Sequence, residues 1–200
     1  MIDVCANSGW LSSAITCMHL LQMVMQGLWC DRDSSLRMLP CMTEDLVSSL
    51  NRRGILKVPQ LLDVPFATLQ ALTDNSTASR LQQELQYFPR MRVQLKVQRR
   101  DSDGDEGLRL NIRLERSNSG HRTSRAFVPR FPKVKDEAWW LVLGSSSTAE
   151  LHALKRVSFS DRLLTHLDIP STANLKGMKV ILVSDCYIGF EQEYNIEEFA

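Results

Sequence analysis

The hydrophobic pattern of the chain changes its period at Met91, and this change limits what the second half can fold into. From Met91 to Gln98, and again from Leu108 to Glu115, apolar and polar residues alternate one for one. A period of two places the apolar side chains on one face, which is typical of a half-buried β-strand. The polar, glycine-bearing segment 102–107 lies between the two runs and predicts a hairpin.

Further strand candidates follow this hairpin. They are the segments 123–128, 138–143, 151–159, 163–169, 178–185 and 190–198. Stretches rich in Gly, Ser, Asn and Pro separate them, as expected for turns. Many short strands at this spacing predict an immunoglobulin-like or fibronectin-III-like antiparallel β-sandwich over residues 91–200.

Residues 31–90 carry the signals of short helices. Thr43 is placed to cap a helix that begins at Glu44 and stops at Gly54, a residue type that often ends helices. Three more short helices are expected at 58–63, 65–72 and 76–88, and the first two hold a proline near their start. This segment is predicted to form a small helix-loop-helix unit, so the fold class is α+β.

The first thirty residues are strongly apolar, with no charged residue from Val4 to Cys30. Helices are expected at 2–7 and 10–29. Such a run is compatible with a membrane span, because about 20 apolar residues cross a bilayer. A secretory signal peptide would begin with basic residues, whereas Asp3 is the early charge here.

A polar stripe along the second helix favours a buried helix instead. Its members recur at three- or four-residue steps: Ser12, Thr16, His19, Gln22 and Gln26. A stripe of this kind suits a helix packed among other helices with one wetter edge. We therefore expect residues 1–30 to be the last helices of a bundle, with packing positions at Trp10, Ala14, Cys17, Met18, Leu21, Val24, Met25 and Leu28. Covering helices are missing from the chain, which suggests a fragment of a longer protein.

The letters Asp-Glu-Ala-Trp at 136–139 match the D-E-A-x box of ATP-driven helicases, but their setting differs. An ATPase needs a phosphate-binding loop of the form G-x-x-x-x-G-K-S/T, and no Gly-Lys-Ser/Thr occurs in the sequence. The acidic pair also precedes an apolar segment, whereas the magnesium-binding acids of such enzymes follow a strand. We therefore predict no catalytic and no cofactor-binding residue in this chain.

Cysteines and histidines show no spacing typical of a metal site. The five cysteines are odd in number and contain no C-x-x-C pair, and the four histidines lack H-x-x-x-H spacing. No metal site and no disulfide framework are predicted. The expected compartment is reducing and intracellular.

Positive charge is concentrated in residues 90–135, which hold thirteen Lys or Arg and five acids in a chain of net charge +1. These residues either form the solvent face of strands or bind phosphates or an acidic partner. Aromatic residues for base stacking are sparse there, with only Phe127 and Phe131. Candidate contacts to nucleic acid or to a partner are Arg52, Arg53, Arg109, Arg113, Lys133, Lys135 and Trp140, whose ring is expected to face outward because that of Trp139 faces the core.

The order of these parts, with particular residues in each, resembles a known family. The matching residues are Gly9-Trp10-Leu11, Gln22-Met23, Gln26, Trp29, Phe131-Pro132-Lys133, Lys135-Asp136-Glu137, Trp139-Trp140, Leu143-Gly144, Leu154-Lys155-Arg156, Ser184-Asp185, Tyr187, Gly189 and Gln192-Glu193-Tyr194. As a set they are similar to the Sec-sixty-three domain of two-cassette, Ski2-like DExH-box RNA helicases. The residues around Lys135 and the segment 151–157 resemble the copies of the activating signal cointegrator type more than those of the spliceosomal U5 type.

This resemblance implies that the chain is the C-terminal part of a helicase. In the family a longer helical bundle and two helicase cores precede this region, and ATP and magnesium bind only in those cores. The resemblance therefore implies a non-catalytic module that docks the upstream helicase cassette of the same protein and the protein partners of a helicase complex. Contact with RNA or DNA is a secondary expectation, and the implied location is nuclear or cytoplasmic, with no membrane.

Two other interpretations stay open at this point. A free-standing nucleic-acid-binding module would use the basic stretch 90–135, and its affinity would fall steeply with salt. A translocon component of the J-protein type would carry a related domain, but the sequence has no His-Pro-Asp motif of a J-domain.

Overall fold

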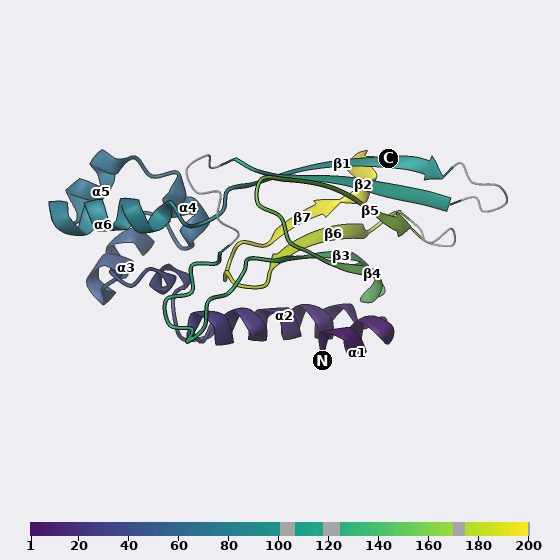
Figure 1. Ribbon diagram of the computed structural model, residues 1–200, viewed down its shortest axis with the longest axis horizontal. Helices are drawn as coiled ribbons and strands as arrows, with labels where there is room; N and C mark the ends of the chain where they lie inside the picture. The colour runs from purple at the N-terminus through teal and green to yellow at the C-terminus, as the bar shows by residue number, and fades with distance from the viewer. Residues whose placement is uncertain (101–106, 118–124, 170–174, 200) are drawn as a thin grey trace.

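The computed structural model describes residues 1–100, 107–117, 125–169 and 175–199, which form helices followed by two antiparallel sheets (Figure 1). Helices α1 (Ile2–Asn7) and α2 (Leu11–Gln26) lie side by side along the sheets, and a group of shorter helices lies at one end of them. The predicted α+β class, with a helical part before a β-rich part, is confirmed.

The small helical unit follows the predicted start signals. It consists of η1 (Ser35–Met38), α3 (Glu44–Asn51), α4 (Val58–Leu62), α5 (Phe66–Leu72) and α6 (Asn75–Leu85). The Thr43 hydroxyl accepts a hydrogen bond from the amide of Leu46 and caps α3, as predicted. The Asp74 carboxylate accepts from the amides of Ser76 and Thr77 and caps α6. These caps satisfy amides that have no partner within the first turn, which stabilises helices of this length.

Every strand runs antiparallel to its neighbours. One sheet has the order β1-β2-β5, formed by β1 (Met91–Arg100), β2 (Gly107–Arg116) and β5 (Arg162–Ile169). The other has the order β4-β3-β6-β7, formed by β3 (Trp139–Ser145), β4 (Glu150–Val157), β6 (Met178–Ser184) and β7 (Gln192–Asn195). Pairing of Met91 with Arg116 and of Arg100 with Gly107 confirms the predicted hairpin.

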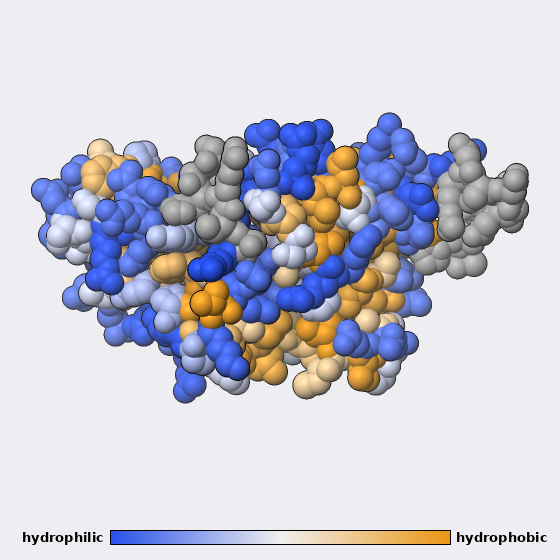
Figure 2. All heavy atoms as spheres, viewed as in Figure 1, coloured by the Kyte–Doolittle hydropathy of each residue, from blue (hydrophilic) through white to orange (hydrophobic). Residues whose placement is uncertain are grey.

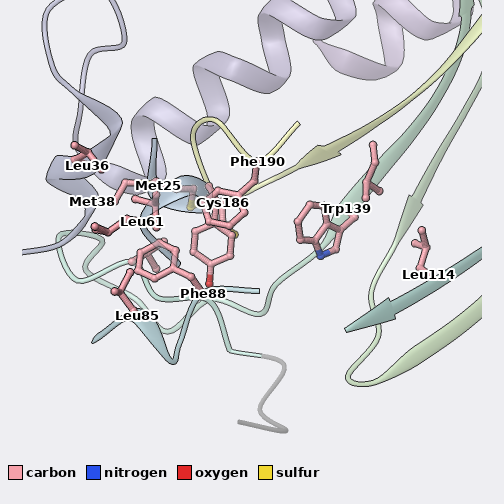
Figure 3. Packing of buried hydrophobic residues seen from close by; sticks show 14 of the residues in the cluster. Met25, Leu36, Met38, Leu61, Leu85, Phe88, Leu114, Trp139, Cys186 and Phe190 are labelled. Carbon is pink, nitrogen blue, oxygen red and sulfur yellow. The ribbon is translucent and has the colours of Figure 1, made fainter. Parts of the chain in front are cut away.

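An apolar core lies between the two sheets and continues into the helical unit. The inward face of β2 contributes Leu110, Ile112 and Leu114, and β3 contributes Trp139, all of them at most 1% exposed. Leu110, Ile112 and Leu114 are apolar positions of the period-two pattern. The pattern therefore predicted correctly which face of β2 is buried. The same cluster extends through the helical unit to Phe88 (Figure 3).

The predicted strand at 123–128 is wrong in its described part, residues 125–128. Only an isolated bridge joins Arg125 to Asp136, and the amide of Phe127 donates to the Tyr187 hydroxyl at 2.8 Å instead of to a neighbouring strand. Pro129 follows and has no amide hydrogen for a sheet. Residues 123 and 124 lie outside the described residues.

The predicted strand at 190–198 is shorter than expected. β7 ends at Asn195, and the chain continues as the 3-10 turn η2 (Ile196–Phe199). Asn195 pairs with Lys179, next to the first residue of β6, so the ladder has no further partner beyond it. Glu197 instead accepts a hydrogen bond from the amide of Gly177 at 2.7 Å.

The α1–α2 pair covers the outer face of the β4-β3-β6-β7 sheet (Figure 1), so a sheet packs against one side of the pair, where helices of a bundle were expected from the sequence. A second apolar cluster joins the two layers, and its buried members are Cys5, Leu11, Ala14, Met18, Val142, Leu151 and Val183. Gly144 allows the close approach, because a Cβ atom there would lie 2.8 Å from both terminal carbons of Leu11. The sheet therefore buries one side of the α1–α2 pair.

The uncharged run from Val4 to Cys30 is interrupted by glycines at both ends of α2. Gly9 and Gly27 have φ angles of 71° and 60°, in the left-handed region that favours glycine. α2 itself contains 16 residues. Within the described ranges, no helix combines the length and the apolar character that crossing a membrane requires.

Candidate functional site

The polar stripe of α2 turns toward the sheets at the C-terminal half of the helix. Gln22 Nε2 donates to the carbonyl oxygen of Ser184 at 2.7 Å, and Gln26 Nε2 donates to that of Cys186 at 2.8 Å. Both glutamines are buried. The predicted wetter edge is therefore wrong for these two residues, because their amides satisfy carbonyl groups at and just beyond the end of β6.

With its glutamines turned inward, α2 leaves apolar side chains in solvent. Leu20 and Val24, one turn apart, are 39% and 58% exposed, and Met23 beside them is partly buried. We call these three residues the outer surface of α2. Hydrophobic residues gather along the side of the molecule in Figure 2 where Figure 1 places α1 and α2. Val24 was expected to face a packing partner, whereas Leu20 and Met23 were not among the expected packing positions.

A buried ion pair connects the sheets to the helical unit. Arg116 Nη2 lies 3.2 Å from Glu137 Oε2 and 3.3 Å from the carbonyl oxygen of Tyr87, and the two side chains of the pair are 4% and 2% exposed. Glu137 Oε1 accepts a hydrogen bond from Trp139 Nε1 at 3.0 Å. Burial raises the pKa of the Glu137 carboxyl, although the Arg116 guanidinium opposes this shift. The glutamate of the Asp-Glu-Ala-Trp sequence thus belongs to the interior.

A second buried carboxylate, Asp185, ties the turn after β6 to the loop before β3. Its Oδ1 accepts a hydrogen bond from the amide of Ala138 at 3.0 Å. Its Oδ2 lies 2.6 Å from Arg156 Nη2 and 3.9 Å from Lys135 Nζ. Because Asp185 has no exposed area, these two cations compensate a charge that water does not reach.

An aromatic cluster surrounds Phe88, which Figure 3 shows close to Cys186 and Phe190. Phe88, which follows α6, has its ring centroid 5.4 Å from Phe127, 5.2 Å from Tyr187 and 5.8 Å from Phe190. Burial raises the pKa of the Tyr187 phenol well above its ordinary value. We call the contacts around Glu137, Asp185 and Phe88 the joint. They show that the helical unit shares a core with the sheets.

Arg109 and Arg113 are the predicted contact residues that the structure brings onto one surface. They lie on the outer face of β2, separated by Asn111. Arg109 Nε pairs with Asp168 at 3.0 Å, and Arg113 Nη2 pairs with Glu115 at 2.6 Å. Their expected contact with a ligand stays a prediction.

The other predicted contact residues lie apart from this surface. Arg52 and Arg53 are exposed at the end of α3, and Lys133 is exposed in the loop before β3. Lys135 stands beside Asp185 in the joint. Trp140 faces away from the core as predicted, but the α1–α2 pair partly covers it, and the Arg156 guanidinium lies 5.5 Å from its ring centroid.

The buried ionisable groups of the joint are engaged with one another. In the part of the chain that the structure describes, no group of three or more His, Cys, Asp or Glu is placed to hold a metal ion. The buried carboxylates of Glu137 and Asp185 are engaged by cations and hydrogen bonds of the interior. The feature that calls for a function is therefore the outer surface of α2, which the joint and the glutamines hold in place.

Sequence comparison shows which family this chain belongs to. Residues 1–197 match the Sec63 Brl domain family. The chain belongs to this family. The Sec63 Brl domain therefore extends over the terminal helices, the helical unit and both sheets, and the predicted resemblance is confirmed.

Relatives of this Sec63 Brl domain occur in large helicases. DExH-box ATP-dependent RNA helicase DExH14 of Arabidopsis thaliana is 58% identical over 100% of this chain and 9% of its own length. The human U5 small nuclear ribonucleoprotein 200 kDa helicase is 29% identical over 97% of this chain and 9% of its own length. Activating signal cointegrator 1 complex subunit 3 of the mouse is 28% identical over 98% of this chain and 11% of its own length. The chain thus spans a small part of the length of these relatives.

Five of the residues that carried the resemblance meet in one region of the Sec63 Brl domain. Gln22, Gln26, Glu137, Asp185 and Tyr187 come from distant parts of the sequence, and all of them lie in the joint or between α2 and the sheets. Each is a polar or aromatic group with a partner in the structure.

Proposed function

We propose that the chain is the non-catalytic C-terminal interaction module of a Ski2-like, ATP-dependent DExH-box helicase. Support comes from the match to the Sec63 Brl domain over residues 1–197 and from two relatives named as helicases, of each of which the chain spans 9%. In this proposal, ATP, magnesium and the unwinding of nucleic acid belong to the helicase cores, and this chain docks against them.

The observation that carries the proposal is the outer surface of α2. The solvent side of α2 begins with exposed polar residues, among them Ser13 and Thr16, and becomes apolar toward its C-terminal end. Here the sheet covers one side, while Leu20 and Val24 remain in solvent on the other. Exposed apolar side chains on a small protein mark interaction sites when they adjoin one another. The occupant that we propose is the upstream helicase cassette of the same polypeptide.

Charged substitutions on the outer surface of α2 test this docking. The double variant Leu20→Asp/Val24→Asp is expected to lose binding to the upstream cassette when the two are produced as separate chains. A buried Leu or Val side chain contributes about 1.5–3 kcal/mol, so losing two of them weakens docking by a factor of about 100 or more. The dissociation constant measured by titration calorimetry reports the effect.

A matched control separates docking from stability. Leu164 on β5 is 72% exposed, and Leu164→Asp should leave docking unchanged. Each of these exposed substitutions should alter the free energy of unfolding by no more than about 0.5 kcal/mol. Undiminished docking of the α2 variant would show that the cassette binds elsewhere or not at all.

The type of sandwich is a further part of the proposal. We propose a fibronectin-III-like fold within the broader immunoglobulin-like class. The support is the strand order, with β1-β2-β5 in one sheet and β4-β3-β6-β7 in the other. In a fibronectin-III-like fold, the fourth strand belongs to the same sheet as the third, sixth and seventh strands, as β4 does here.

Partners and location follow from the same proposal. The human and mouse relatives are named as components of a U5 small nuclear ribonucleoprotein and of a signal cointegrator complex. By analogy, the chain contributes to a multi-subunit helicase assembly in the nucleus or cytoplasm and contacts protein partners there. Trp10 and Trp29, which flank α2 in the sequence, are exposed aromatic side chains that a partner can contact.

A further inference from the structure

The outer face of the β1-β2-β5 sheet is polar and carries more positive than negative charge. It lies on the sheet that α2 does not cover, on the opposite side of the molecule (Figure 1). At the twelve outward positions within 92–98, 109–115 and 162–168, the strand register places five cations and two acids: Arg92, Gln94, Lys96, Gln98, Arg109, Asn111, Arg113, Glu115, Arg162, Leu164, His166 and Asp168.

Three arginines converge on one carboxylate at the end of this face where β1 begins. Arg113 Nε and Nη2 lie 3.1 and 2.6 Å from Glu115 Oε1, and Arg162 Nε lies 2.8 Å from the same oxygen. Arg92 is paired with Glu115 in the register between β1 and β2. Arg113 above all, and Arg162 and Arg92 to a lesser degree, hold the pKa of Glu115 below its ordinary value. We call these four residues the arginine cluster.

The arginine cluster keeps a surplus of two positive charges, because one carboxylate faces three guanidinium groups. The side chains of Arg113 and Arg162 are 39% and 58% exposed, so their unused donors face solvent. Exposed ion pairs contribute little to stability, and guanidinium groups crowded together repel one another. The planar donor fork of arginine matches the oxygens of a phosphate group.

The same face lacks the means to read bases. None of its twelve outward residues is aromatic, so bases cannot stack on it as they do on single-strand-binding platforms. Beyond the arginine cluster, Lys96, Asn111 and His166 form the next row of side chains across the three strands. This composition suits contacts with a sugar-phosphate backbone, which position a nucleic acid without sequence preference.

We propose that the arginine cluster binds the phosphodiester backbone of RNA. Arg113 and Arg162 supply the phosphate contacts, Arg92 adds positive potential, and Glu115 holds the guanidinium groups in place while the site is empty. Because the β4-β3-β6-β7 sheet lies between this face and α2, RNA can bind while α2 is docked. The site therefore goes beyond the docking function and does not depend on it.

The salt dependence of RNA binding by the whole chain tests this site. Fluorescence anisotropy with a labelled oligouridylate should give a log–log plot of affinity against salt concentration with a negative slope. For single strands each phosphate contact contributes about 0.7 to the slope, so Arg113→Gln/Arg162→Gln should reduce its magnitude by about 1.4 and weaken binding about tenfold or more. The charge-matched control Arg32→Gln/Arg80→Gln, at two exposed arginines of the helical unit, should leave the slope nearly unchanged.

A third variant reverses the sign of the effect. Glu115→Gln removes the carboxylate that competes with phosphate, and it should strengthen RNA binding several-fold. A purely structural role for Glu115 would change only the thermal midpoint, which is measured for every variant. The proposal is overturned if the Arg113→Gln/Arg162→Gln variant keeps the affinity and slope of the unmodified chain, if both arginine pairs lose the same amount, or if a phosphoserine peptide binds and RNA does not.

Discussion

Replacing Arg116 by methionine is expected to lower the free energy of unfolding by about 3–5 kcal/mol. The guanidinium is the charge partner of Glu137 and also donates to the carbonyl oxygen of Tyr87. Without it, the Glu137 carboxyl, which is 2% exposed, must either carry an uncompensated buried charge or bind a proton. Chemical denaturation followed by tryptophan fluorescence measures the loss. A loss below about 1 kcal/mol would contradict the buried ion pair.

Removing the second charge as well should restore part of that stability. In Arg116→Met/Glu137→Gln the side-chain amide still offers an oxygen to Trp139 Nε1, but no unpaired charge remains. The double variant should therefore be less destabilised than the sum of the two single variants, with a coupling energy of about 0.5–3 kcal/mol. Additive effects would mean that the two side chains do not interact in the folded protein.

The Arg116→Met variant should also respond to pH in a defined direction. Burial already raises the pKa of Glu137 in the folded protein above its ordinary value of 4.5, and loss of Arg116 raises it further. The folded state then holds a proton that the unfolded state releases, so this group favours folding at acid pH. The stability of the variant should fall as pH rises from about 4.5 through the raised pKa, more steeply than that of the unmodified chain.

Phe88→Ala is expected to cost about 3–5 kcal/mol, as for other fully buried aromatic residues. Phe88 has no exposed area and packs on Phe127, Tyr187 and Phe190. It follows the last helix of the helical unit, whereas its ring partners belong to the sandwich region, so the cavity opens between the two. The unmodified chain should unfold in one transition when observed by tryptophan fluorescence and by helical circular dichroism.

Leu164→Ala provides the matched control, because Leu164 is 72% exposed on the far sheet and its loss should alter stability by no more than about 0.5 kcal/mol. The predicted division into terminal helices, helical unit and sandwich stays a prediction about sequence segments. Two separate unfolding transitions in the unmodified chain, with Phe88→Ala affecting only one of them, would contradict a shared core.

Local patterns were sufficient for much of the fold. The alternation from Met91 onward assigned the hairpin and its buried face, because each strand repeats its orientation every two residues. Thr43 and Gly54 marked the region of α3, because caps and left-handed turns require particular residue types. The strand at 123–128 failed for the converse reason, since the amide of Phe127 finds its partner in a distant tyrosine hydroxyl and no local pattern records that contact.

Long-range polar contacts account for the other differences. Gln22 and Gln26 look like a solvent edge in the sequence, and only the carbonyl groups of Ser184 and Cys186 explain their burial. Once these glutamines face inward, Leu20 and Val24 are left on the solvent side of α2, together with the exposed Thr16. A helical projection alone leaves both orientations open, which is why Leu20 was missed.

The predicted contact residues show the same limit. Arg109 and Arg113 share a face because they are four positions apart on one strand, where every second side chain points to the same side. This could be predicted from the sequence. Arg92 and Arg162 join them only through the pairing of β1 and β5 with β2. Lys135 looked similar to the other cations, yet it stands beside the buried Asp185.

The size of the endogenous polypeptide tests most directly the claim that this chain is one module of a helicase. An antibody raised against residues 91–200 would be used on a denaturing blot of total cell protein. We expect a band many times heavier than 22.8 kDa, because the chain matches only 9–11% of the length of its relatives. A single band near 22.8 kDa would contradict it and would leave a free module with no motor of its own.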